Sequence, residues 1–122
     1  MYRSIILLLL SFSAFAHEMT PSHPELKLSH VPGVLKAEMA MFNKRQDVQY
    51  YEIGVFTEDW RPVPFVSSYR LAKLRYLEHL NFDVYIREED AKRAVYLCSL
   101  SKLKETAEYK PAVSSRICSR FR

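Results

Sequence analysis

The sequence predicts an all-β fold, an antiparallel β-sandwich of about seven strands in one domain. Three observations support this prediction. Short segments in which apolar and polar residues alternate are separated by turn-forming residues about every 8–12 positions. No stretch shows the apolar periodicity of a long helix. The two cysteines, Cys98 and Cys118, both lie late in the 122-residue chain, as a pair that could join neighbouring strands.

Residues 1–16 have the features of a cleaved signal peptide. Arg3 gives a positive start, residues 5–10 form a short apolar run, and Ala14-Phe15-Ala16 has the small-residue pattern of a cleavage site. The apolar run is too short to span a bilayer, which needs about 20 residues. We therefore expect a mature chain that begins at His17, is periplasmic or secreted, and keeps no stable membrane anchor.

Residues 17–33 predict an extended N-terminal arm, because the segment is rich in Pro, His and Ser. Within it, Leu26 and Leu28 are the only regular apolar pair and predict one edge strand. Gly33 marks a turn, after which the sandwich domain is expected over residues 34–122.

A polar hairpin opens this domain. Residues 35–41 and 48–56 alternate in the manner of half-buried strands, and residues 43–47 form a polar turn between them. A second turn follows at residues 57–59. Pro62 and Pro64 then exclude a central strand immediately afterwards, because proline cannot donate to a strand ladder.

Later segments predict the remaining strands. A short edge strand is expected at residues 65–71, and further strands at 82–86, 94–99 and 113–121, with a charged connection at 87–93 and a basic polar loop at 100–111. Residues 71–80 carry leucines at helical spacing, but the run is short and lies between strand signals. We favour strand and turn there over a one-turn helix. This strand pattern is typical of an Ig-like sandwich.

The cysteine and charge content predicts a disulfide and a solvated basic surface. An even cysteine count in an exported chain predicts a disulfide between Cys98 and Cys118, worth about 3 kcal/mol in the chain-entropy model. The formal net charge is +4, with the basic excess in residues 99–122. Because an exported protein rarely meets nucleic acid, we interpret this excess as solvated surface and expect no nucleic-acid partner.

Several segments resemble the N-terminal Ig-like domain of the periplasmic pilus-assembly chaperones, the PapD-like superfamily. The similar runs are VLKAEMAMFNKRQDVQYYEIGVF, PVPF, YRL, FDVYI, DAKRAVYLC and the closing SSRICSRF. The resemblance covers most of the expected sandwich. It implies an Ig-like fold, a periplasmic location, and binding of another protein through the closing strand at a sheet edge.

The mature N-terminus is a candidate metal site. After cleavage, His17 would offer an α-amino group and an imidazole, and Met19 and His23 follow on the same arm. Nitrogen and sulfur ligands of this kind suit copper. The alternative is that cleavage simply exposes whichever residue comes next. A periplasmic copper-binding protein is thus an alternative function, and no other cofactor is expected.

No constellation predicts an enzyme. The serines lack a recognisable His and Asp partnership, the acidic clusters lie in polar turns, and only Gly33 and Gly54 are glycines, so a phosphate-binding loop is excluded. We expect a protein-binding domain, chaperone-like or accessory to envelope or appendage assembly. Its predicted contact residues are Trp60 at a turn and Val113, Ser115 and Ile117 on the closing strand. A structural envelope or appendage component is a further alternative.

Overall fold

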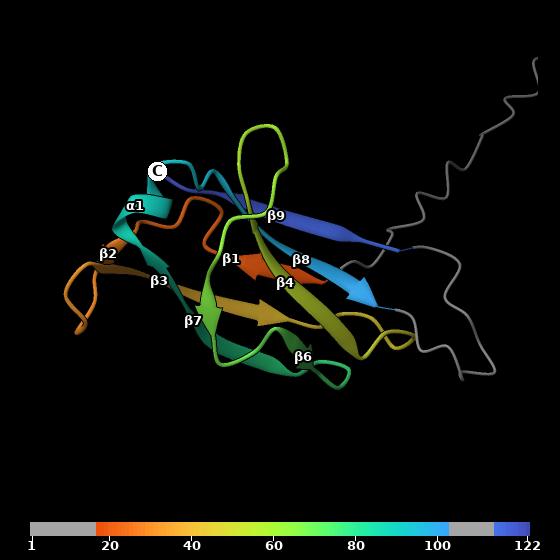
Figure 1. Ribbon diagram of the computed structural model, residues 1–122. Helices are drawn as coiled ribbons and strands as arrows, with labels where there is room; N and C mark the ends of the chain where they lie inside the picture. The colour runs from red at the N-terminus through yellow and green to blue at the C-terminus, as the bar shows by residue number, and fades with distance from the viewer. Residues whose placement is uncertain (1–16, 103–113) are drawn as a thin grey trace, which may run out of the picture.

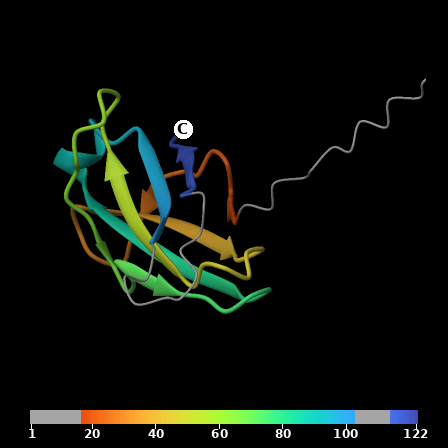
Figure 2. The same cartoon turned by 90° about the vertical axis from the view of Figure 1, so that its right-hand side faces the viewer.

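The computed structural model describes residues 17–102 and 114–122, which form two antiparallel sheets packed face to face (Figures 1 and 2). The predicted all-β sandwich is confirmed. Within the described residues, the one helix is the four-residue α1 (Glu88–Ala91), which lies in the segment predicted as a charged connection. No helix in this part of the chain is long and apolar enough to cross a membrane. The predicted signal peptide, residues 1–16, lies outside the described residues.

The first sheet has the order β1-β3-β7-β5, with β2 also paired to β3. Its strands are β1 (Glu18–Thr20), β2 (Lys27–Leu28), β3 (Val34–Phe42), β5 (Val66–Ser67) and β7 (His79–Arg87). The second sheet has the order β6-β4-β8-β9. Its strands are β6 (Leu71–Lys73), β4 (Tyr50–Phe56), β8 (Tyr96–Lys102) and β9 (Arg116–Arg120).

The core lies between the sheets and follows from the period-2 pattern of the long strands. Strand β3 buries Ala37, Met39 and Met41, which alternate with outward residues. Strands β4, β7 and β8 add further buried side chains in the same alternating manner, namely Tyr51, Ile53, Val55, Phe82, Val84, Ile86 and Leu97. A one-residue slip of any of these strands would turn its apolar set to solvent, so the pattern also fixes the register.

Three segments differ from the sequence prediction. The arm contains β1 as well as the predicted edge strand β2, and both pair with β3. The single edge strand expected at 65–71 is two short strands in different sheets, β5 and β6, because the chain crosses between the sheets here. Strand β8 runs to Lys102, into the predicted loop. Strand and turn at 71–80 are confirmed, since β6 is followed by a turn and then by β7.

The predicted disulfide is confirmed. It joins Cys98 of β8 to Cys118 of β9, with an S–S distance of 2.06 Å and a Cα–Cα distance of 4.1 Å. The two residues are directly opposite in the ladder. The disulfide therefore fixes the last strand to its neighbour at the edge of the second sheet.

Candidate binding edge at strand β9

Strand β9 is the last strand of the second sheet, and its hydrogen-bonding pattern decides which backbone groups face outward. Ser101 N–H donates to the Ser115 carbonyl and Phe121 N–H donates to the Val95 carbonyl, each at 2.9 Å. Because bonding alternates along an antiparallel ladder, positions 115, 117, 119 and 121 bond to β8. The backbone groups of Arg116, Cys118 and Arg120 therefore point away from β8.

The N-terminal arm forms backbone hydrogen bonds with only one end of this edge. Arg120 N–H donates to the Ser22 carbonyl at 2.9 Å, and Arg122 N–H donates to the Pro24 carbonyl at 3.1 Å. The arm therefore lies beside the C-terminal end of β9, as Figures 1 and 2 show. Strand β1 lies nearby, but its ladder is with β3. Within residues 17–102 and 114–122, the outward N–H groups of Arg116 and Cys118 have no partner.

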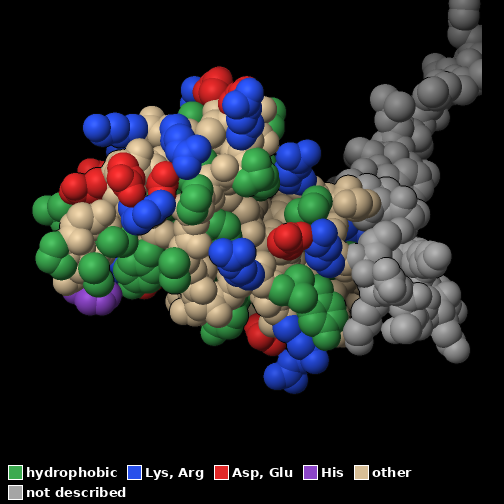
Figure 3. Space-filling model, in the orientation of Figure 1, with side chains coloured by type: hydrophobic (Ala, Val, Ile, Leu, Met, Phe, Trp, Pro, Cys, Tyr) green, Lys and Arg blue, Asp and Glu red, His purple; other side chains and the backbone are tan. Residues whose placement is uncertain are grey.

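Aromatic and arginine side chains flank the open part of the edge on the outer face of the second sheet. Trp60 stacks on Tyr96, with ring centroids 4.3 Å apart and planes 4° apart. The Arg116 guanidinium lies 5.1 Å from the centroid of the Trp60 ring. Arg120 is held by Glu58 at 3.2 Å and lies over Tyr96. Basic side chains are spread across the molecular face shown in Figure 3, among acidic and hydrophobic ones.

Trp60 is held in an unusual backbone conformation. Its φ of 65° lies in the left-handed region, which non-glycine residues seldom adopt. Its N–H donates to the Thr57 carbonyl at 3.0 Å, and the residue is 46% exposed. The hydrogen bonds of the turn, from Trp60 N–H to the Thr57 carbonyl and from Thr57 N–H to the Arg61 carbonyl, maintain this conformation.

A small cavity lies beside Arg116 on the same outer face. Its volume is about 130 Å³, and its lining residues are Glu52, Gly54, Phe56, Cys98, Leu100 and Arg116. The Phe56 ring lies across Gly54, since a Cβ built at Gly54 would be 2.8 Å from ring atoms of Phe56. Gly54 therefore allows the aromatic ring to pack against the outer face of β4.

The inner side of the edge is polar rather than apolar. His17 is 1% exposed, and its Nε2 lies 2.7 Å from Ser99 Oγ while its Nδ1 lies 3.2 Å from Ser115 Oγ. The ring also packs against Tyr51 at a centroid distance of 4.3 Å. Burial lowers the pKa of His17 to about 4, against the raising effect of the Ser99 hydrogen bond, and the charge of Arg45 lowers it further. His17 is therefore neutral near pH 7.

The buried polar network continues into the β3–β4 hairpin. Tyr51 OH donates to Asn43 Oδ1 at 2.6 Å, and burial raises the pKa of Tyr51 to about 12. Arg45 binds Asp47 through two hydrogen bonds of 2.9 and 2.6 Å, which lower the pKa of Asp47. Arg45 NH1 also approaches Ser115 Oγ at 3.4 Å. These contacts hold the start of β9 in place, so the open edge is presented by a fixed strand.

The residues proposed for copper do not point to one place. His17 and Met19 are buried, whereas His23 is exposed and its Nδ1 lies 3.3 Å from the Arg120 carbonyl oxygen. Both ring nitrogens of His17 are engaged by serine hydroxyls. Within the described part of the chain, no three His, Cys, Asp or Glu side chains form a group that could hold a metal ion.

The residues predicted for partner binding lie in different situations. Trp60 is exposed beside the edge, whereas Ile117 faces inward and packs against the core. Ser115 faces inward and its N–H donates to Ser101 Oγ at 2.8 Å. Val113 lies outside the described residues. The outward positions, Arg116 and Cys118, belong to the other alternating set. The cysteine pair is a sequence signal that the prediction did not use: directly opposite residues come closest in a non-hydrogen-bonded pair, which would place Cys118 in the outward set.

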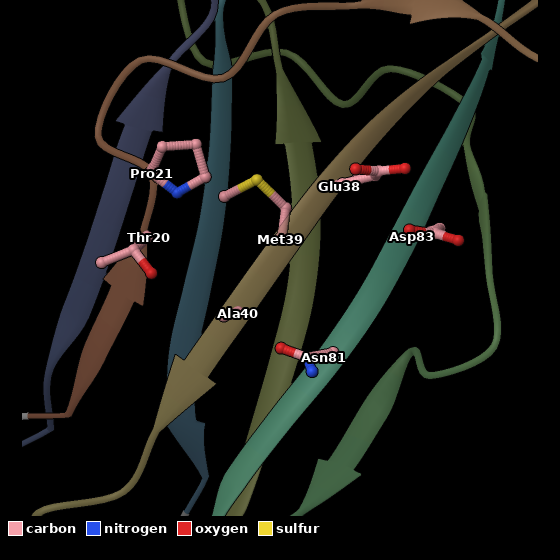
Figure 4. Close-up of a pocket in the computed structure, with 7 residues that line it drawn as sticks. All are labelled: Thr20, Pro21, Glu38, Met39, Ala40, Asn81 and Asp83. Carbon is pink, nitrogen blue, oxygen red and sulfur yellow. The ribbon is translucent and has the colours of Figure 1, made fainter.

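A second surface feature lies on the outer face of the first sheet. It is an open groove of about 470 Å³ lined by Thr20, Pro21, Glu38, Met39, Ala40, Asn81 and Asp83 (Figure 4). Glu38 and Asp83 are directly opposite on β3 and β7, and Lys36 lies 3.2 Å from Glu38. The hydrogen bond to Glu38 raises the pKa of Lys36. The groove lacks the buried, convergent polar groups of a ligand site.

Comparison with known proteins gives a likeness in fold. No protein-family model matches the chain, and no curated protein sequence matches it. Among solved structures, the E. coli chaperone DraB is similar, with a TM-score of 0.64 and 13% sequence identity over 88% of this chain. The match covers 53% of the DraB chain, so this protein spans about half the length of that chaperone. The resemblance to the pilus-assembly chaperones is thus confirmed for the fold, an Ig-like sandwich similar to that of a chaperone.

Proposed function

We propose that this protein is an exported, chaperone-like binding domain, which adds an extended segment of another protein to the open edge of β9. The observation that carries the proposal is the pair of outward N–H groups at Arg116 and Cys118, which have no partner within the described residues. An exposed strand edge offers main-chain hydrogen bonds to a peptide, and the neighbouring side chains then select among peptides. The likeness in fold to DraB, a chaperone, supports the same class of function.

The disulfide and the predicted signal peptide support the location. Disulfides persist in oxidising compartments, such as the periplasm and the cell exterior. The Cys98–Cys118 disulfide also holds β9 against β8 while its other edge stays open. A partner would therefore meet a strand that is already ordered, which reduces the entropy lost on binding. The partner would be another periplasmic or surface protein, in envelope or appendage assembly.

Proline at position 116 tests the edge directly. Arg116→Pro removes an outward N–H and leaves the bonds of β9 to β8, since proline is tolerated where its missing N–H faces solvent. Arg116→Ala removes the same side chain but keeps the N–H. Native mass spectrometry of the full chain from the bacterial periplasm would compare the two. We expect a second polypeptide bound to the alanine variant and at least tenfold less bound to the proline variant.

Amide exchange in the unsubstituted chain locates the contact. Bound partner should slow exchange at the amides of Arg116 and Cys118, while the amides of Ser115 and Phe121, which lie on the β8 side, change little. Equal melting temperatures for the proline and alanine variants would show that the fold is intact. Equal amounts of bound polypeptide on the two variants would contradict the proposal, as would unchanged exchange at Arg116 and Cys118.

A further inference from the structure

The charges along the open edge indicate which kind of segment fits it. The outward side chains of β9 are Arg116, Cys118 and Arg120. Arg120 is engaged by Glu58 and by the Tyr96 hydroxyl, at 3.2 and 3.1 Å. Arg116, at the open part, lies over Trp60 and forms no ion pair with any carboxylate of the described residues. Within residues 17–102 and 114–122, the open edge therefore presents one arginine that has no ion-pair partner.

A strand added to β9 brings its own side chains close to this arginine. Directly opposite residues on paired strands have Cβ atoms about 4.5–5.5 Å apart and lie on the same face of the sheet. An acidic side chain opposite Arg116 would reach the guanidinium, and carboxylate–arginine pairs form charge-assisted hydrogen bonds. Contact with Trp60 already restricts the Arg116 side chain, so less conformational entropy is lost when the pair forms.

The same charges disfavour a second copy of this chain as the added strand. Two β9 strands paired along their open edges would bring two Arg116 side chains to the same outer face, at opposite or neighbouring positions. Like charges at such positions destabilise strand pairing, and charged residues on an edge protect it against self-association. The β9 edge is thus better suited to a different chain than to itself.

We infer that the segment bound at β9 carries an acidic residue on the outer face opposite Arg116, and that Arg116 selects for it. This inference rests on the proposed function, since it requires that a strand adds to the β9 edge. The partner is therefore an extended segment of another protein with an acidic residue at this position. Trp60 is a positioning residue, which holds the Arg116 side chain over the outer face.

The test uses two tails fused to the C-terminus of the full chain. Arg116 lies about 20 Å along the strand from Arg122, and a Gly/Ser linker of about 15 residues spans about 22 Å. One tail ends in Thr-Val-Glu-Val-Thr and the other in Thr-Val-Lys-Val-Thr. Fusion makes binding intramolecular, with an effective concentration in the millimolar range. The readout is the amide exchange rate at positions 116 and 118, measured by NMR.

We expect the glutamate tail to protect these amides about threefold more than the lysine tail, the effect of one cross-strand charge pair. In Arg116→Glu the lysine tail should protect these amides more than the glutamate tail. Arg61→Glu is the matched control, because Arg61 is exposed, is paired with Asp59 on the neighbouring turn and changes the net charge equally. In this control the glutamate tail should still protect the amides more than the lysine tail. Melting curves would confirm that each variant is folded.

The possible outcomes separate the two claims. Equal protection by both tails would overturn the role of Arg116 and leave edge binding standing. If Arg61→Glu made the lysine tail the more protective one, the difference between the tails would be due to long-range charge. This result would also overturn the role of Arg116. Protection by neither tail would contradict strand addition at this edge, and with it both the proposed function and this inference.

Discussion

At the scale of single residues, the serines of the inner face differ in their hydrogen bonding. Ser99 and Ser119 are both almost fully buried, at 0% and 1% exposure. Ser99 Oγ lies 2.7 Å from His17 Nε2, whereas Ser119 Oγ has no partner within the described residues. A buried hydroxyl without a partner keeps its desolvation cost, about 1–3 kcal/mol. The two positions therefore form a matched pair for mutagenesis.

Substituting each serine by alanine should change stability in opposite directions. Ser119→Ala should raise the free energy of unfolding by about 1 kcal/mol, because it removes an unpaired polar group. Ser99→Ala should lower it by about 1 kcal/mol or more, because it leaves the buried His17 imidazole without that partner. Urea denaturation with equal m-values would measure both changes. If Ser119→Ala lowered the free energy of unfolding as much as Ser99→Ala, the Ser119 hydroxyl would have a hydrogen-bond partner.

The buried His17 predicts a dependence of stability on pH. Its pKa is about 4 in the folded protein and about 6.5 when exposed, so the unfolded chain binds the proton more readily. The free energy of unfolding should therefore fall as the pH decreases from about 6.5 to about 4. The pKa of Asp47 is lowered by Arg45, so this carboxylate adds a further loss of stability at lower pH. The pH ranges in which His17 and Asp47 reduce stability are therefore separate.

His17→Gln should flatten the pH dependence in the upper range, because glutamine keeps a donor and an acceptor but does not titrate. Denaturant midpoints measured between pH 4 and 7 would give the slope. His30→Gln, at an exposed histidine, is the control and should leave the slope unchanged. An unchanged slope in His17→Gln would show that another group is responsible.

At the scale of elements, the disulfide is a covalent constraint on β9. Replacing both cysteines by alanine opens a loop with a sequence separation of 20 residues, and should lower the free energy of unfolding by about 3 kcal/mol. Reduction of the native protein should lower the free energy of unfolding by the same amount. Reducing conditions should cause no further loss in the variant without cysteines. A difference below about 1 kcal/mol would show that the β8–β9 ladder holds this strand by itself.

The long strands were predictable because their side chains alternate. Residues 35–41, 48–56 and 82–86 were placed in β3, β4 and β7 from periodicity alone. Strand β1 was not predicted, because a three-residue strand is too short to show a period. The division of residues 65–71 into β5 and β6 was also missed, because each strand has only two or three residues and pairing across the sandwich has no local signal.

The candidate site was only partly predictable for a related reason. The sequence identified the closing strand and Trp60, but not which alternating set of β9 faces outward. Both sets mix polar and apolar residues, Arg116 and Cys118 in one and Ser115 and Ile117 in the other, so hydropathy does not separate them. The choice follows from long-range hydrogen bonds to β8 and to the arm. The burial of His17 was hidden for the same reason, since its partners Ser99 and Ser115 are distant in the sequence.

At the scale of the whole molecule, the two edges of the second sheet differ. Strand β6, at the opposite edge, is short and exposes Leu71 and Lys73, and lysine on an edge discourages pairing. Strand β9 is longer and is fixed by a disulfide, a buried polar network and the arm. Of these two edges, β9 is therefore the longer and the more firmly ordered.

The bonds from Arg120 and Arg122 to the arm also set a limit of length. A segment that adds to β9 can bond at Arg116 and Cys118, but at Arg120 it meets a donor that Ser22 already occupies. The arm thus limits how far an added strand can extend along β9, to only a few residues. Under the proposed function, a partner would bond to β9 along only a short length of its backbone, so its release would break few hydrogen bonds.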